Sequence, residues 1–264
     1  MRLNSRWLAV LLLFTVIPLS GCGFLKKLRA RDNLNKGVKA FTEQKYSAAA
    51  QFFQKSLQMD PEFETARMYL ATAYTSMFVP GSTDPASEEN ARKAIETFTE
   101  VVERAPDPAD PNRNAMLSIA SLYYQLKNYP QSKEWCNRVL KVDPQNAEAY
   151  YRIAVIDFDD SFEKTGIQGE NVAYMSPEEK AETLANVDEA LTSLTKALEI
   201  RPDYFDAMEY QNLLWREKAK FEEDEETKAG LIREADKVSL KALELRLKAQ
   251  EEAAKKPRKL AIGN

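Results

Sequence analysis

Apolar and small residues recur at intervals of three and four along most of the chain, from about residue 30 to about residue 253, which is the period of amphipathic α-helices. Four of these stretches end at a proline, and the residues before each proline are alike. They read KSLQMDP, EVVERAP, RVLKVDP and KALEIRP, and they end at Pro61, Pro106, Pro144 and Pro202. Because proline cannot continue a helix, each stretch is predicted to be a helix that stops there. The pattern predicts an all-α chain.

Counting back from each proline brings small residues into register. In the helix that ends at the proline, one small position is filled by Ala49, Ala94, Ser132 and Ala190, and the position four residues later by Phe53, Phe98, Cys136 and Leu194. In the helix before it, the small position is filled by Gly37, Ala71, Ala120 and Ala154. Small residues let two antiparallel helices approach closely, and larger apolar residues fill the space between neighbouring units. The register predicts an array of helix pairs.

This register resembles the tetratricopeptide repeat, a unit of about 34 residues. The sequence departs from the family pattern at its Trp position, which is filled by Asn33, Arg67, Met116 and Tyr150. The resemblance implies an α-solenoid of antiparallel helix pairs. It implies four repeats over residues 30–63, 64–108, 113–146 and 147–202, a degenerate capping pair over 203–253 and a disordered tail over 254–264. In the last helix of the capping pair, one apolar stripe is expected from Leu231, Ala235, Val238, Ala242 and Leu245.

The second and fourth repeats are longer than the pattern requires, by about 11 and about 24 residues, and the excess falls between their two helices. Helix-start signals follow each insertion: Asp84-Pro85 in the second repeat, and Ser176 with Glu179, a capping box, in the fourth. The second helices of both repeats are therefore predicted to start early and protrude. Because the turns within helix pairs of a solenoid share one edge, both insertions are expected there, either as functional loops or as tolerated surface insertions.

The first residues have the anatomy of a signal peptide. Arg2 and Arg6 precede a mostly apolar run over residues 7–17, which is too short to span a bilayer. The string Leu19-Ser20-Gly21-Cys22 then resembles the lipobox of bacterial lipoproteins. That resemblance implies cleavage after residue 21 and attachment of lipid, including palmitate, to Cys22.

In gammaproteobacterial lipoproteins an Asp after the modified cysteine retains the protein in the inner membrane. Gly23 stands there instead, which implies the outer membrane, facing the periplasm. Residues 22–29 are expected to be a membrane-proximal linker. The basic residues of this linker, together with Arg31 just after it, either rest on anionic headgroups or are solvated, and both interpretations stay open. These residues are Lys26, Lys27, Arg29 and Arg31.

The composition excludes the common catalytic and metal-binding sites. The chain has no histidine and two cysteines, so Ser-His-Asp and Cys-His nucleophiles and the usual imidazole metal sites cannot be built. Its formal net charge is -4, which offers no electrostatic footprint for nucleic acid. Cys136 occupies a core position, and a disulfide with Cys22 competes with lipidation of that residue. We expect no catalytic residue, no cofactor, no metal and no small-molecule substrate.

An acidic cluster follows in the fourth repeat, made by Asp157, Asp159, Asp160 and Glu163. Oxygen ligands suit hard cations, but the cluster lacks the glycine placement of an EF-hand loop. It is therefore interpreted as a solvated helix end.

The remaining candidate is a groove for a partner. In the tetratricopeptide family the first helices line the concave face, so the resemblance places Leu34, Val38, Phe41, Met68, Thr72, Thr75, Leu117, Ser121, Tyr124, Tyr151, Val155 and Phe158 there. The predicted partner-binding residues are Met68, Leu117, Tyr124, Tyr151, Val155 and Phe158. Such an apolar strip suits an extended or helical peptide. Alternatively, the chain's own N-terminal segment or C-terminal helix fills the groove.

These features predict a non-catalytic, lipid-anchored scaffold that mediates protein–protein interaction in the bacterial cell envelope, as an assembly or adaptor factor. A second hypothesis is an accessory subunit that regulates an envelope enzyme or a secretion or pilus machine. The sequence does not separate the two.

Overall fold

The computed structural model describes the backbone of residues 18–255 and the side chains from Gly23 onward, except that of Ala253. Every regular element in this part of the chain is a helix, which confirms the predicted all-α class. None of these helices is long and apolar enough to cross a membrane. Most of the expected signal peptide (1–17), the side chain of Cys22 and most of the expected tail (256–264) lie outside the described residues.

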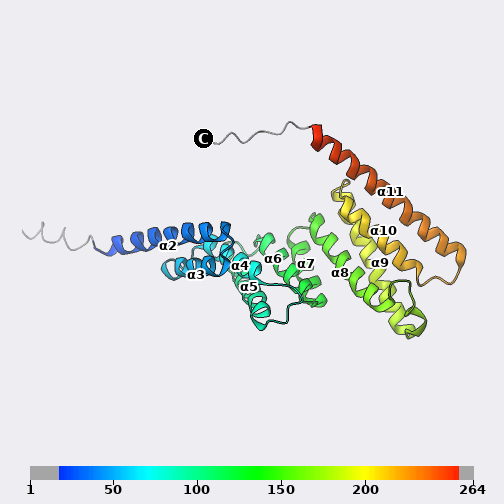
Figure 1. Cartoon of the computed structure of the whole chain (residues 1–264), viewed down its shortest axis with the longest axis horizontal. Coiled ribbons are helices and arrows are strands. Elements are labelled where there is room, and N and C mark those ends of the chain that lie inside the picture. Colours follow the sequence, from blue (N-terminus) through cyan, green and yellow to red (C-terminus); the bar gives the residue numbers. More distant parts are fainter. Residues whose placement is uncertain (1–17, 256–264) are drawn as a thin grey trace, which may run out of the picture. The chain divides into compact units, whose positions relative to one another are not determined.

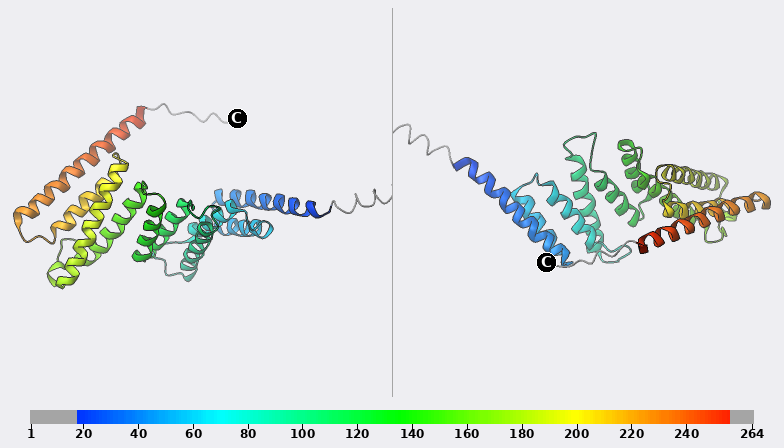
Figure 2. Two further views of the ribbon diagram at one scale, coloured as in Figure 1. Left: turned by 180° about the vertical axis from the view of Figure 1, so that it is seen from behind. Right: turned by 90° about the horizontal axis from the view of Figure 1, so that it is seen from above.

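The chain divides into two compact units, Met1–Leu126 and Lys127–Asn264. In the first unit, α2 pairs with α3 and α4 with α5, while α3 also packs on α4 and α5 on α6 (Figures 1 and 2). Its helices are α2 (Pro18–Thr42), α3 (Tyr46–Met59), α4 (Glu64–Met77), α5 (Pro85–Glu103) and α6 (Arg113–Gln125).

In the second unit, α8 pairs with α9 and α10 with α11, while α7 packs on α8 and α10 contacts both α8 and α9 (Figures 1 and 2). Its elements are α7 (Tyr129–Val142), α8 (Ala147–Thr165), the short 3₁₀ turn η1 (Val172–Tyr174), α9 (Pro177–Ile200), α10 (Phe205–Ala219) and α11 (Glu225–Lys255). The boundary between units divides the third predicted repeat, since α6 belongs to one unit and α7 to the other.

The small positions of the register lie at the closest helix contacts. Ala94, Ala154 and Ala190 are completely buried. A Cβ atom on Gly37 would fall 2.6 Å from Cδ1 of the Phe53 ring, so only glycine fits that contact without a shift. The predicted stripe of the last helix is fully buried at Ala235 and Ala242 and half-buried at its other three positions. These contacts confirm the predicted packing within each unit.

The turns inside helix pairs are of two kinds. Gln44 and Lys127 occupy the same register position and have left-handed backbones, with φ of 59° and 57°, which reverses the chain within a few residues. The second and fourth repeats have longer connections. There the Asp84 carboxylate accepts a hydrogen bond from the Ala86 N–H, and Ser176 with Glu179 forms the predicted capping box.

Two boundaries differ from the sequence prediction. Residues 22–29, expected to be a linker, continue α2 as helix. In the fourth repeat the extra length is shared, because α8 runs on to Thr165 before the insertion begins, so the first helix protrudes as well as the second. Neither extended segment contains a sequence signal that would end its helix.

Candidate interaction surfaces

All the predicted groove positions described above lie on first helices, and each is half-buried. In the first unit, Met68 lies on α4, and Leu117 and Tyr124 lie on α6. The hydroxyls of Thr72 and Thr75 donate to the backbone of their own helix, to Met68 O at 2.8 Å and Ala71 O at 3.0 Å. Those hydroxyl protons are therefore engaged within α4, and the strip offers a partner mainly apolar contacts.

In the second unit, Tyr151, Val155 and Phe158 share one face of α8, and aromatic rings of α10 and of its N-cap residue pack onto it. The Tyr151 ring lies 5.0 Å from that of Tyr204 and 5.5 Å from that of Tyr210, and Phe158 lies 5.6 Å from Tyr210. The last two contacts are edge-to-face, a favourable geometry for aromatic pairs. The predicted residues are thus joined by α10 aromatics that sequence reasoning did not assign to the groove.

This aromatic cluster is tied to the core of the second unit. Tyr151, Phe158 and Tyr210 pack against the buried residues of α9 and α10. Burial raises the pKa of the Tyr151 phenol to about 12. The Tyr204 hydroxyl donates to the Glu148 carboxylate at 2.7 Å. Tyr151 and Phe158 therefore contribute to packing as well as to the surface.

The interpretation of the acidic cluster in α8 as a solvated helix end is wrong for Asp157. Asp157 is only 4% exposed, and its carboxylate accepts hydrogen bonds from Lys133 Nζ of α7 at 2.9 and 3.1 Å. The same ammonium group contacts Glu189 of α9 at 3.0 Å. Burial raises the pKa of Asp157 to about 6, against the opposing effect of Lys133.

Lysines also pair with two of the other acids in this segment, Lys164 with Asp160 and Lys127 with Glu163. Among the described residues, no group of three His, Cys, Asp or Glu side chains is arranged to hold a metal ion. A cavity of about 300 Å³ opens beside Lys133 and Asp157, between α7, α8 and α9. Cys136, on α7, is a free buried thiol, and burial raises its pKa to about 12, so it is a core residue as predicted.

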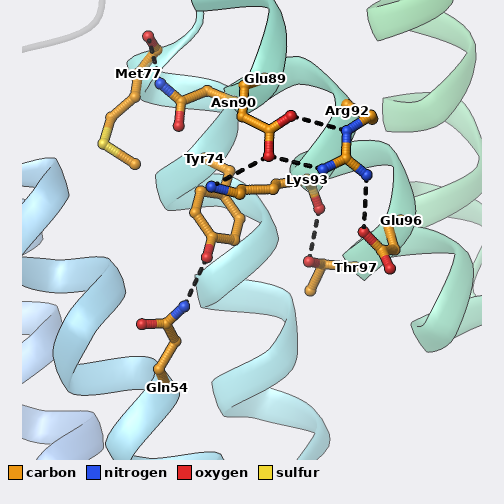
Figure 3. A network of polar contacts seen from close by, with 9 residues as sticks. All are labelled: Gln54, Tyr74, Met77, Glu89, Asn90, Arg92, Lys93, Glu96 and Thr97. Atoms are coloured by element: carbon orange, nitrogen blue, oxygen red, sulfur yellow. Dashed lines mark hydrogen bonds and ion pairs between the residues drawn. The ribbon is translucent and has the colours of Figure 1, made fainter. Parts of the chain in front are cut away.

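A surface that sequence reasoning missed lies between α5 and α6 in the first unit. Ile95, Tyr123 and Leu126 contribute apolar side chains to a cavity of about 360 Å³, and Arg92 and Glu89 stand at its side. Figure 3 shows the polar network there: Arg92 contacts Glu89 at 2.7 Å and Glu96 at 3.6 Å, and Lys93 contacts Glu89 at 3.4 Å. The hydrogen bond from Arg92 lowers the pKa of Glu89 to about 2.

Both insertions are ordered and display apolar side chains. In the first, the Ser87 hydroxyl bonds to the N–H and C=O of Val79, at 2.8 and 3.0 Å, while the Val79 side chain is exposed. In the second, Ile167 is 74% and Tyr174 88% exposed. Apolar residues exposed singly are common on protein surfaces, so the exposure of these side chains does not by itself assign the insertions a role.

A buried polar network holds the second insertion onto α10. Glu217, which is 2% exposed, accepts hydrogen bonds from Ser161 and Thr165 at the end of α8. Lys220 pairs with Glu217 at 2.6 Å and donates to the Gly166 carbonyl at 2.6 Å. The start of the loop is therefore fastened by groups that lie some 50 residues further along the chain, a pairing with no local sequence signal.

The burial of Asp157 predicts a pH-dependent stability. Because its folded-state pKa is raised from 3.8 to about 6, the folded protein holds a proton that the unfolded chain has already lost between these values. Stability should therefore fall as pH rises through this window, by on the order of 3 kcal/mol relative to Asp157→Asn. Urea unfolding of both proteins from pH 4 to 7 measures the difference. Asp32→Asn, at an exposed carboxylate of α2, is the control, and parallel stability curves for Asp157→Asn and the wild type would contradict the assignment.

Comparison with known proteins agrees with this geometry. Residues 86–154 match the tetratricopeptide repeat family. A DnaJ homolog subfamily C member 7 homolog from Dictyostelium discoideum is 23% identical over 172 residues, which cover 64% of this chain. The match spans only 31% of that relative's length.

Solved structures show the same fold at low identity. A crystal structure of MamA superposes with a TM-score of 0.57 at 17% identity, covering 89% of this chain and 98% of that one. A MamA fragment from Desulfovibrio magneticus gives 0.55 at 11% identity, over 83% and 96%. YrrB, described as a TPR protein with an unusual peptide-binding site, gives 0.50 at 14% identity, over 83% and 90%. The chain therefore carries tetratricopeptide-like repeats in an all-α, solenoid-type fold.

Proposed function

We propose that this protein is a non-catalytic scaffold that binds a segment of another protein along its first helices. The observation that carries the proposal is the strip of half-buried apolar residues on those helices, which includes Met68, Leu117 and Tyr124 in the first unit. Such residues combine apolar area with access for a ligand, and Tyr is favoured at protein interfaces because it has few rotors to freeze. The peptide-binding site described for YrrB, which shares the fold, supports this reading.

The two units suit different roles in binding. In the second unit, Tyr151 and Phe158 already pack on α10, so only part of each ring is available to a partner. In the first unit, Met68 on α4 and Leu117 on α6 are half-buried apolar side chains. We therefore place the main anchors in the first unit and assign the α8 aromatics a mixed role in folding and contact.

Substitution of the first-unit anchors tests the scaffold function. Leu117→Gln with Tyr124→Gln keeps helix propensity and removes two apolar anchors, so partner affinity should fall by about 2–4 kcal/mol. The measurement is quantitative recovery of envelope proteins on the immobilised variant, together with its thermal unfolding. Leu240→Gln with Leu243→Gln, on the exposed face of α11, is the matched control. Unchanged recovery at unchanged stability would remove these residues from the binding surface.

We further propose that the protein works at the bacterial cell envelope, anchored through lipid on Cys22 and facing the periplasm from the outer membrane. The support is the order of residues around Cys22: a basic start, an apolar run and then Leu19-Ser20-Gly21-Cys22. Two or three acyl chains anchor a protein stably, whereas one binds only marginally. An anchored scaffold of this kind fits an assembly or adaptor factor for envelope proteins.

The lipid anchor has a direct chemical test. Intact mass of the membrane-extracted protein should show cleavage before Cys22 and the added mass of a diacylglycerol on its sulfur. Cys22→Ala should lack both the added mass and the cleavage. A wild-type protein that begins at Cys22 without acyl mass would exclude the anchor and leave the scaffold function untouched.

A further inference from the structure

The first turns of α2 lie outside the helix pair. α2 extends beyond the end of α3, as Figures 1 and 2 show. The last tight contact between them is at Ala30, which is fully buried and whose carbonyl accepts a hydrogen bond from the Ser56 hydroxyl at 2.7 Å. Every residue from Gly23 to Arg29 is exposed. This segment is therefore helical without support from the repeats.

Its exposed side chains are arranged as an amphipathic helix. Phe24, Leu25 and Leu28 are 70%, 52% and 54% exposed. At roughly 100° per residue they share one face, which lies roughly opposite the side on which Ala30 meets α3. The apolar face of these turns is therefore not a continuation of the protein core, since it points away from it.

Basic side chains border this apolar face on both sides. By the same helical geometry, Lys27 and Arg31 lie on one side of it and Arg29 on the other, while Lys26 lies nearly opposite. Residues 18–31 contain no acidic residue, whereas the whole chain has a net charge of -4. An anionic surface would therefore attract this segment and repel the remainder of the chain.

We propose that residues 23–31 form a membrane-surface helix that lies on an anionic phospholipid bilayer, with Phe24, Leu25 and Leu28 inserted among the acyl chains. Long basic side chains beside an inserted apolar face extend to the phosphate groups while their stems stay in apolar surroundings. Each basic residue near an anionic surface strengthens binding about fivefold. The inference goes beyond partner binding by the repeats and rests on the proposed anchor only for delivery to the membrane.

The contact would also explain how an unsupported helix end is kept ordered. A short helix without tertiary packing is marginal in water, so its backbone amides should exchange with solvent quickly. Insertion of the apolar face into the interface would slow that exchange. Local amide exchange therefore reports the contact itself, whereas the total amount of membrane-bound protein reports the anchor.

The test is hydrogen–deuterium exchange of the full-length protein on vesicles isolated by flotation. Phosphatidylcholine vesicles are compared with vesicles that also contain phosphatidylglycerol. On the anionic vesicles, amides in residues 24–31 should exchange about tenfold more slowly than on the neutral ones, and high salt should remove the difference. Phe24→Gln with Leu25→Gln and Leu28→Gln should abolish the slowing. So should neutralisation of the four basic residues by Gln.

Leu240→Gln with Leu243→Gln and Leu247→Gln is the matched control, because it removes three leucines of similar exposure from α11. It should leave exchange in residues 24–31 unchanged. Equal exchange rates on both kinds of vesicle would overturn the proposal. So would protection that rises with protein concentration without vesicles, since a second copy would then cover the face. Binding to anionic but not to neutral vesicles would refute the lipid anchor while supporting the helix.

Discussion

The close approach of paired helices at their small residues is the constraint on which the remaining structure depends. Gly37 of α2 leaves room for the Phe53 ring of α3, which is fully buried and stacks at 5.4 Å on Tyr69 of α4. One small residue therefore lets a single ring join three helices. Because each helix pair offers the surface on which the next one packs, the spacing set at such contacts determines where the first helices, and the strip they display, come to lie.

Local chemistry explains which features could be predicted from the sequence. Helix ends depend on caps and turns within a few residues, so Asp84 and the Ser176–Glu179 box were identified correctly. Partners from distant elements leave no such signal. In the sequence Asp157 resembles a solvated acid, because its hydrogen-bond partner Lys133 comes from another helix, α7. The α10 aromatics that pack on Tyr151 and Phe158, and the division of the third repeat between two units, depend on tertiary contacts.

Charge and apolar exposure are distributed unevenly over this chain, and that distribution connects fold to function. The exposed apolar residues of α2 lie among basic groups, which suits a lipid surface. Ile167 and Tyr174 of the second insertion lie on a loop held by the buried Glu217–Lys220 pair, which suits contact with protein. The proposed membrane contact and the proposed partner contact thus use separate residues. An anionic surface that attracts the start of α2 would repel the acidic repeat region that follows it.

The packing constraint is tested most directly at Gly37. Ala is the better helix former by about 1 kcal/mol, so Gly37→Ala would stabilise an unconstrained helix. Here the added methyl would overlap the buried Phe53 ring, so urea unfolding should instead show destabilisation, by about 1–3 kcal/mol. In Gly37→Ala with Phe53→Leu, the two costs should be less than additive, because the smaller side chain makes room for the methyl. A Gly37→Ala protein more stable than the wild type would contradict the account.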